Sequence, residues 1–430
     1  MKKLFTLILT VILAVGCCFG LTACGDDGDT VKVGLICLHD DNSTYDKNFI
    51  DAMKDACEAK GVKLVLKTNI PEGEECYTAA VDLANQGCKA IFANSFGHED
   101  YVIRAAEEYP DVQFCHATGT KAKTKNLANF HNAFADIYKG RFAAGYAAGL
   151  KLNEMAKDGG LDAKKDASGA ITVGYVGAFT YAEVVSGFTS WYLGVKMAYA
   201  GDVNMKVKFT GSWYDETEER NAALDLIDNH NCALISQHAD SWGAPKACEE
   251  KNIPNVSYNG STGSQCPNTF IVSSRINWQP YFEYMIDGVT VDGAKIATDW
   301  SAAYGNYYNA QSGAVVLTSI GKGAAEGTAE ILDQLVYALM YEEGFEVFDT
   351  SRFTVTVTDD KNTNAVVDEY GHLISYKVGD VECVKTGTIS YGEGAEYNYN
   401  YFAESNVELF RSAPYFDLQI DGITYLNTKF

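Results

Sequence analysis

The chain has 430 residues, a formal net charge of -23 and 47% hydrophobic residues. This length exceeds what one hydrophobic core usually serves, so we expect two or more lobes. The acidic charge argues against nucleic acid or an anionic lipid surface as a partner, because both require a basic face.

The N-terminal residues have the pattern of a signal peptide. Two lysines follow the initial methionine, an apolar run covers residues 4–20, and small residues precede Cys24. The run is shorter than the roughly 20 apolar residues of a spanning helix. The stretch Leu21-Thr22-Ala23-Cys24 resembles a bacterial lipobox, whose cysteine carries lipid and becomes the mature N-terminus. We expect a signal peptide over 1–23, lipidation of Cys24 and a flexible tether over 24–30, with an ordinary secretory signal as the alternative.

Strands and helices then alternate, and we expect this remainder of the chain to be soluble, because it has no further long apolar run. Alternation of this kind implies right-handed crossovers and a parallel sheet. Expected strands are 31–38, 62–66, 90–93 and 113–117, with helices at 48–60, 76–86 and 101–109.

A long helix is expected at 134–153, and the polar stretch 158–168 interrupts the pattern. Two successive α/β units separated by a break predict two Rossmann-like lobes. In the second unit we expect strands at 171–176, 206–211, 233–237, 255–258 and 269–272, and helices at 184–199, 217–230 and 244–251.

Two more helices are expected, at 280–287 and 327–342. From residue 345 onward the character changes to alternating β-type runs, such as 353–357, with turns and many tyrosines. We interpret residues 346–430 as a C-terminal extension of unknown role.

The cysteines beyond the signal region do not suggest a disulfide framework. Nine is an odd number, and none of these residues forms a CxxC pair. Several lie in apolar runs, where a reduced cysteine behaves as a small hydrophobe, so we expect mostly core positions, with one structural disulfide as the alternative. They are Cys37, Cys57, Cys76, Cys88, Cys115, Cys232, Cys248, Cys266 and Cys383.

Familiar catalytic signatures are missing from the sequence, which lacks GxSxG, HExxH, GxxxxGK[ST] and a GxGxxG after the first strand. The 7 histidines are too dispersed for an obvious metal cluster. Residues 360–364 match the start of a calcium loop, but Ala365 stands where glycine is needed, so a solvated turn is favoured. We predict no catalytic residue, cofactor or metal.

Polar and aromatic residues follow the expected strands, at the edge where open α/β sheets bind ligands. Flat aromatic faces beside carboxylates and amides suit a planar, hydrogen-bonding heterocycle, with or without a sugar. The alternative is that the carboxylates cap helices, favoured for Asp215, and that Trp213 packs in the core. The candidates are Asp40, Asp41, Asn42, Phe96, Trp213, His238 and Asp240.

At these residues the sequence resembles the basic membrane lipoprotein (BMP) family, the type I substrate-binding proteins of ABC importers, many of which bind purine nucleosides or related compounds. The likeness covers roughly residues 31–345. It is carried by residues 46–49 (DKNF), 93–100 (ANSFGHED), 140–149 (GRFAAGYAAG), 174–177 with Gly187-Phe188, and 211–215 (GSWYD).

The resemblance implies the α/β type I periplasmic-binding-protein fold, with two Rossmann-like lobes of parallel sheet joined by a three-strand hinge and followed by the C-terminal extension. The N-terminal lobe would comprise 31–130 and 273–297, and the C-terminal lobe 131–272 and 298–345. The chain would cross between them near residues 118–135, 270–275 and 290–300.

The resemblance also implies binding residues. The base-stacking aromatics fall on Phe49 and Trp213, and the acidic first loop, 40–42, would bind the base. Asn259 stands where an aspartate usually grips the ribose, which weakens the case for a nucleoside because a charge-assisted hydrogen bond is lost. The family's basic residue falls between Arg275 and Asn277.

Residues 237–241 and 277–281 look like a branch of the family whose ligands are free purine bases or other heterocycles. A base held between Trp213 and Trp278, with Asp240 reading its edge, would fit this branch.

The expected function is an extracytoplasmic, lipid-anchored receptor at the cell membrane that closes on a small ligand and presents it to ABC permease subunits, performing no chemistry. One alternative is a sensor of the same fold that feeds a membrane signalling receptor. Another is a nucleoside hydrolase using Asp40 and Asp41 with a metal.

Overall fold

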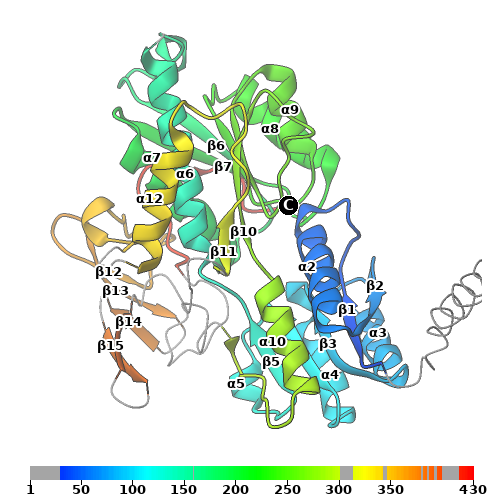
Figure 1. Cartoon of the computed structure of the whole chain (residues 1–430). Helices are drawn as coiled ribbons and strands as arrows, with labels where there is room; N and C mark the ends of the chain where they lie inside the picture. Colours follow the sequence, from blue (N-terminus) through cyan, green and yellow to red (C-terminus); the bar gives the residue numbers. More distant parts are fainter. Residues whose placement is uncertain are drawn as a thin grey trace, which may run out of the picture.

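The computed structural model describes residues 30–157, 159–300, 313–341, 346–378, 381–384, 387–391, 395–399 and 416–430. The expected signal peptide, the lipidation site at Cys24 and the tether up to residue 29 lie outside these residues. Within the described ranges, no helix combines the length and the apolar character needed to cross a bilayer. Figure 1 shows two lobes, with the strands of the C-terminal extension beside the larger one.

The first lobe is built on a parallel sheet in the order β2-β1-β3-β4-β5. Helices cover both faces of this sheet, so its strands are largely buried. The strands are β1 (Lys32–Ile36), β2 (Lys63–Lys67), β3 (Cys88–Ala93), β4 (Gln113–Ala117) and β5 (Phe130–Ala133), and the helices are α2 (Thr44–Lys60), α3 (Glu74–Asn85), η1 (Phe96–His98), α4 (Glu99–Glu108), α5 (Ala122–Lys125) and α10 (Gln279–Thr290).

The second lobe is built on a sheet in the order β11-β10-β9-β8-β6-β7-β17. Its strands are parallel except for β11, which runs antiparallel to β10. The strands are β6 (Ile171–Gly177), β7 (Val203–Phe209), β8 (Ile235–Gln237), β9 (Asn255–Tyr258), β10 (Phe270–Ile276), β11 (Val315–Leu317) and β17 (Ile423–Tyr425), and the helices are α6 (Ile137–Lys157), η2 (Asp162–Lys164), α7 (Ala182–Ala198), α8 (Glu216–Asp228), α9 (Gly243–Lys251) and α12 (Thr328–Tyr341).

Both lobes repeat one topology. The order β2-β1-β3-β4-β5 in the first lobe matches β7-β6-β8-β9-β10 in the second. In each, the strand order reverses beside the first strand, and the loops leaving the carboxyl ends of the strands on either side of that point enclose a crevice. Ligand-binding loops are therefore expected after β1 and β3, and after β6 and β8.

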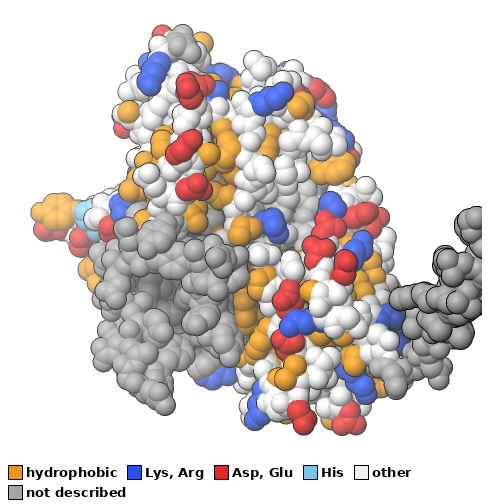
Figure 2. All heavy atoms as spheres, in the orientation of Figure 1, with side chains coloured by type: hydrophobic (Ala, Val, Ile, Leu, Met, Phe, Trp, Pro, Cys, Tyr) orange, Lys and Arg blue, Asp and Glu red, His pale blue; other side chains and the backbone are white. Residues whose placement is uncertain are grey.

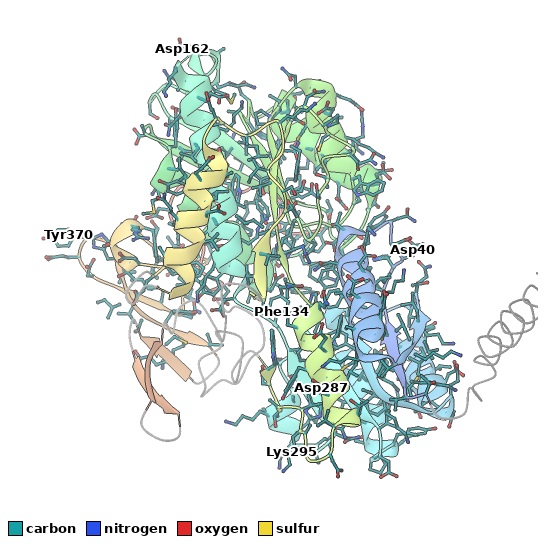
Figure 3. All side chains as sticks on the ribbon, in the orientation of Figure 1. Asp40, Phe134, Asp162, Asp287, Lys295 and Tyr370 are labelled. Carbon is teal, nitrogen blue, oxygen red and sulfur yellow. The ribbon has the colours of Figure 1, made fainter. Side chains whose placement is uncertain are left out.

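The chain passes between the lobes after Ala133, after Ile276 and again beyond residue 300. Figure 3 shows Phe134 at the first of these passages. The lobe boundaries drawn from the sequence, after residues 130 and 272, fall inside β5 and β10, because β5 completes the first sheet and all of β10 belongs to the second.

Helices α6 and α7 pack closely because each carries a glycine at the contact. A Cβ on Gly145 would collide with the carbonyl oxygen of Trp191, and one on Gly194 would collide with that of Phe142. The glycine-rich run 140–149 is therefore explained by this approach of two helix backbones.

The C-terminal extension packs onto the second lobe. The rings of Phe348 and Phe416 stack at 4.4 Å, and both belong to that lobe's buried hydrophobic cluster. Residues 353–357 form no strand, although Phe353 and Val355 are buried as their alternation predicts. The extension contains η3 (Thr350–Arg352), β12 (Ala365–Val367), β13 (Leu373–Val378), β14 (Val381–Val384), β15 (Gly387–Tyr391), β16 (Ala395–Tyr399) and β17.

The prediction of core cysteines is confirmed. All nine cysteines from Cys37 to Cys383 are buried. Burial raises the pKa of the Cys115 thiol to about 12, so this group stays protonated.

Candidate functional site

A cavity of about 240 Å³ lies between the lobes, at the carboxyl ends of the strands where both sheets reverse their order. This volume is below the roughly 300–1,000 Å³ of pockets for drug-sized ligands, so the occupant is small. From the first lobe and the first passage it is lined by His39, Tyr45, Asp46, Ser95, Phe96 and Phe134, and from the second by Tyr181, Glu183, Trp213, His238, Asp240, Tyr258 and Asn259.

Asp46 supplies the carboxylate of the first lobe. Ser43 caps α2 by accepting a hydrogen bond from the Asp46 amide, which fixes Asp46 in the first turn. Its Oδ1 accepts hydrogen bonds from the His39 amide at 3.1 Å and from Asn94 Nδ2 at 2.8 Å. Burial alone would raise the pKa of Asp46, but hydrogen bonds from His39 and Asn94 outweigh it and lower that pKa.

Asp240 supplies a carboxyl group from the loop after β8. Its Oδ1 accepts a hydrogen bond from Asn259 Nδ2 at 3.0 Å, and its amide donates to the Trp213 carbonyl at 2.9 Å. Burial, followed by the charges of Asp46 and Glu219, raises the pKa of Asp240 well above its usual value. Asp240 is therefore disposed to hold a proton, and a protonated carboxyl group can donate as well as accept.

Glu183 and His238 form the second polar group of the larger lobe. Their atoms Oε2 and Nε2 lie 2.7 Å apart, and the Tyr258 hydroxyl donates to Glu183 Oε1 at 3.2 Å. Arg141 lies behind the Tyr258 ring, 4.8 Å from its centroid, and donates to neutral acceptors such as the Tyr175 hydroxyl at 2.7 Å. This buried support fixes the orientation of the Tyr258 ring.

Aromatic side chains form the apolar part of the cavity and extend across its mouth. Trp213 packs against Phe179 with ring centroids 4.9 Å apart. The rings of Phe96 and Tyr181 come from opposite lobes and lie 5.3 Å apart. Both rings are 43% exposed, so they form the outer rim.

The lobes are in direct contact around this cavity. The Thr44 amide and hydroxyl, at the start of α2, donate to the Asp240 carbonyl at 3.0 and 3.1 Å. Near the second passage, Asn48 Nδ2 donates to the Ile276 carbonyl at 2.8 Å.

Figure 2 shows acidic and basic side chains interspersed over the visible face of both lobes.

The structure brings part of the predicted site together. Trp213 lines the cavity and also packs against the core, so its position is compatible with both interpretations of this residue. Asp215 caps α8 by accepting from the amides of Thr217 and Glu218, as favoured from the sequence. The predicted residues that line the cavity are Phe96, Trp213, His238, Asp240 and Asn259.

The acidic loop after β1 lies outside the cavity. Asp40 accepts hydrogen bonds from the amide and side chain of Asn42 at 3.0 and 2.8 Å, which closes a local turn. Asp41 and Asn42 are exposed, and Figure 3 shows Asp40 at the outer side of α2. In this structure these residues do not face the cavity, because the chain turns outward before α2 begins.

Phe49 and Trp278 belong to the core of the first lobe. Their rings stack at 4.5 Å, Phe49 is 0% exposed and Trp278 is 1% exposed. A base held between Trp213 and Trp278 is therefore excluded in this structure. Arg275 donates to Asn48 Oδ1 at 3.0 Å, and the Asn277 amide donates to the Ala314 carbonyl at 2.7 Å, so both residues contribute to the passage between the lobes instead of the cavity.

The cavity residues that were not predicted from the sequence include Tyr45, Asp46, Glu183 and Tyr258. Asp46 lies three residues after a capping serine, and this spacing indicates a helix start without revealing a ligand site. Glu183 is an isolated carboxylate in the first turn of the apolar helix α7, a usable but weak signal.

A family model described as ABC transporter substrate-binding protein PnrA-like matches residues 35–315. The chain belongs to this family. This confirms the family expected from the sequence, a family of substrate-binding proteins of ABC transporters and not of enzymes. The C-terminal extension lies beyond the matched residues.

Individual relatives differ in the ligands that their names give. The chain is 29% identical over 294 residues to a purine-binding protein of Brucella abortus (strain 2308), covering 67% of this chain and 75% of that protein. It is also 29% identical to a putative ABC transporter glucose-binding protein of Haloferax volcanii, covering 45% of this chain and 44% of that protein.

A crystal structure of ABC transporter solute-binding proteins from Aeropyrum pernix K1 has a TM-score of 0.56 and 15% identity, covering 77% of this chain and 94% of that one. This likeness confirms the predicted two-lobed α/β fold.

Proposed function

We propose that the protein is the extracytoplasmic, lipid-anchored substrate-binding component of an ABC importer and that it binds a purine base, a purine nucleoside or a similar heterocycle. The observation that carries the proposal is the composition of the inter-lobe cavity. An aromatic wall that includes Trp213 stands beside the carboxyl groups of Asp46, Glu183 and Asp240. Flat rings favour a planar ligand, and the oxygens favour one that carries N–H donors.

The charge of the cavity further restricts the class of ligand that can bind. No lysine or arginine is among the described residues that line it, whereas three carboxyl groups are. A phosphate or carboxylate on the ligand would be buried without a counter-charge, which is costly. Neutral bases and nucleosides are therefore favoured over nucleotides.

The hydrogen-bonding groups suit the edge of a purine. An adenine edge presents an amino donor beside a ring acceptor. Ionised Asp46 can accept from an amino group, while protonated Asp240 and the amide of Asn259 can donate to ring or sugar acceptors. The Brucella relative named for purine binding supports this ligand class.

The sequence supports the proposed lipid anchor, and the family supports the proposed permease partner. The lipobox at Cys24 would hold the protein at the outer face of the membrane, where an ABC permease recognises the closed state. In the sensor alternative the same closed state docks on a signalling receptor. Asp40 and Asp41, which the hydrolase alternative requires, lie outside the cavity, so nothing in the site favours that alternative.

Isothermal titration of the purified protein tests the ligand class. We expect adenine or adenosine to bind, AMP to bind at least tenfold more weakly than adenosine, and glucose to give no heat. The reason for the AMP effect is the phosphate without a cation partner. Binding of glucose without any purine would refute the proposed ligand class, and release of free base from adenosine during the titration would refute a purely binding role.

A further inference from the structure

The C-terminal segment of the extension returns to the second lobe and forms part of its sheet. β17 pairs in parallel with β7, with Ile423 opposite Met205 and Tyr425 opposite Val207. These residues lie outside the span of the family match, residues 35–315. The sheet of this lobe is therefore completed by a strand that the matched family region does not supply.

After β17 the segment follows β7 to its carboxyl end. The Leu426 amide donates to the Val207 carbonyl at 2.9 Å. The side chain of Asn427 pairs with both backbone groups of Phe209, accepting from its amide at 2.9 Å and donating to its carbonyl at 2.8 Å. Phe209 is the last residue of β7, and the loop 210–215 that carries Trp213 begins immediately after it.

Phe430 then packs against the beginning of that loop. Gly211 has a φ of +73°, a conformation that side-chain-bearing residues rarely adopt, and a Cβ there would meet the Phe430 ring at 2.5 Å. The Phe430 ring also contacts Phe179 edge-on, with centroids 5.6 Å apart. Figure 1 marks this end of the chain at the level where the two lobes meet.

Phe179 connects Phe430 to the cavity. Its ring lies 4.9 Å from Trp213 and 5.0 Å from Tyr181, both of which line the cavity. Phe430 thus supports the back of an aromatic cluster whose front faces the ligand space.

We propose that Phe430 and Asn427 are positioning residues for ligand binding: they hold the loop 210–215 and the Phe179 ring so that Trp213 presents its face to the cavity. A preorganised aromatic face loses less freedom when a ligand binds, which increases affinity without new contacts. The inference rests on the proposed function for its effect on affinity, but its effect on Trp213 does not require a ligand.

The test compares Phe430→Ala with Phe430→Tyr and with the control Ile374→Ala, an exposed apolar residue of the extension. The first readout needs no ligand: the fluorescence of Trp213, obtained by repeating each variant with Trp213→Phe and subtracting. We expect Phe430→Ala to shift this emission to longer wavelength, whereas the other two variants leave it unchanged.

The second readout is the dissociation constant for adenine. Loss of an aromatic contact predicts roughly 2- to 10-fold weaker binding for Phe430→Ala and near-normal binding for Phe430→Tyr and Ile374→Ala. Because Phe430 is 60% exposed, its removal should leave the melting temperature nearly unchanged.

Unchanged Trp213 emission in Phe430→Ala would overturn the inference. So would an emission shift that the control Ile374→Ala reproduces. If adenine fails to bind even the unaltered protein, the proposed function fails, while the emission readout still decides the inference about Phe430. Asn427→Ala provides an independent variant. We expect the amides of residues 209–215 to exchange hydrogen faster in this variant than in the unaltered protein, whereas the amides of β6 should exchange at the same rate in both.

Discussion

Glu219 should control how the stability of the protein changes with pH, because its carboxyl group is 0% exposed beneath the loops that line the cavity. It accepts hydrogen bonds from the amides of Asp215 and Ser241, each at 3.1 Å, and so joins the loop that carries Trp213 to the loop that carries Asp240. Burial is the main reason that its pKa rises from 4.5 to about 7.

The raised pKa of Glu219 determines whether stability increases or decreases with pH. A carboxyl group whose pKa is higher in the folded state keeps its proton on folding, so its stabilising contribution is complete below pH 4.5 and is lost as pH rises through about 7. The size of the pKa shift corresponds to about 3 kcal/mol, since each pKa unit is about 1.4 kcal/mol. Glu219→Gln keeps a polar side chain there but removes the titration.

Urea unfolding at intervals from pH 4.5 to 8 measures this prediction. We expect the unfolding free energy of the unaltered protein to fall by up to about 3 kcal/mol relative to Glu219→Gln across that window. Glu218→Gln, an exposed neighbour on the same helix, should follow the unaltered protein. Parallel curves for Glu219→Gln and the unaltered protein would refute the assignment of a raised pKa to Glu219.

Three further predictions concern the cavity and the packing of the helices. Trp213→Ala should weaken binding of any base-containing ligand by about 5- to 150-fold in titration calorimetry, because stacking on an aromatic ring contributes roughly 1–3 kcal/mol per base, whereas Trp242→Phe, outside the cavity, should bind normally. Asp240→Asn should keep its affinity for the ligand as the pH rises, whereas the unaltered protein should lose affinity because the buried carboxyl group of Asp240 ionises. If the affinity of both proteins changed with pH in the same way, the proton on Asp240 would have no role in binding. Gly145→Ala should lower the unfolding free energy by about 1–3 kcal/mol in urea, despite the better helix propensity of alanine, because its methyl group would collide with the Trp191 carbonyl; stabilisation would contradict this packing.

The alternation of strands and helices was sufficient to predict the fold, but it missed β5, β11 and β17 of the two main sheets, and β5 and β17 show the physical reasons. The sequence of β5 is Phe-His-Asn-Ala, and because two of its four residues are polar, the hydrophobic pattern does not indicate a buried strand. His131 is satisfied by Gln113 and by the Ala297 carbonyl, and Asn132 by Glu99 and the Ala122 amide, all from other elements. β17 has only three residues and finds its partner β7 more than two hundred positions earlier in the chain.

The candidate site was predictable in position but less so in its members. Strand ends located the loops correctly, because parallel strands deliver their carboxyl ends to one edge. The direction in which a side chain points depends on packing that the pattern does not contain. Phe49 lies on an apolar helix face that turns to the core, and Asp46, three positions before it, turns to the cavity.

Under the proposed function, the placement of carboxyl groups on both lobes connects ligand binding to closure of the lobes. Thr44 and Asp240 join the lobes by hydrogen bonds, and burial, followed by the charge of Asp46, raises the pKa of Asp240 in this structure. Without a ligand, bringing these two groups together costs free energy, because either like charges are buried or a proton must be held. A ligand that donates an N–H group to ionised Asp46 and accepts a hydrogen bond from protonated Asp240 offsets this cost in the closed state alone. Under the proposed function, such differential contact is what shifts the population toward closure, whereas a ligand without donors would occupy the aromatic wall and leave the equilibrium unchanged.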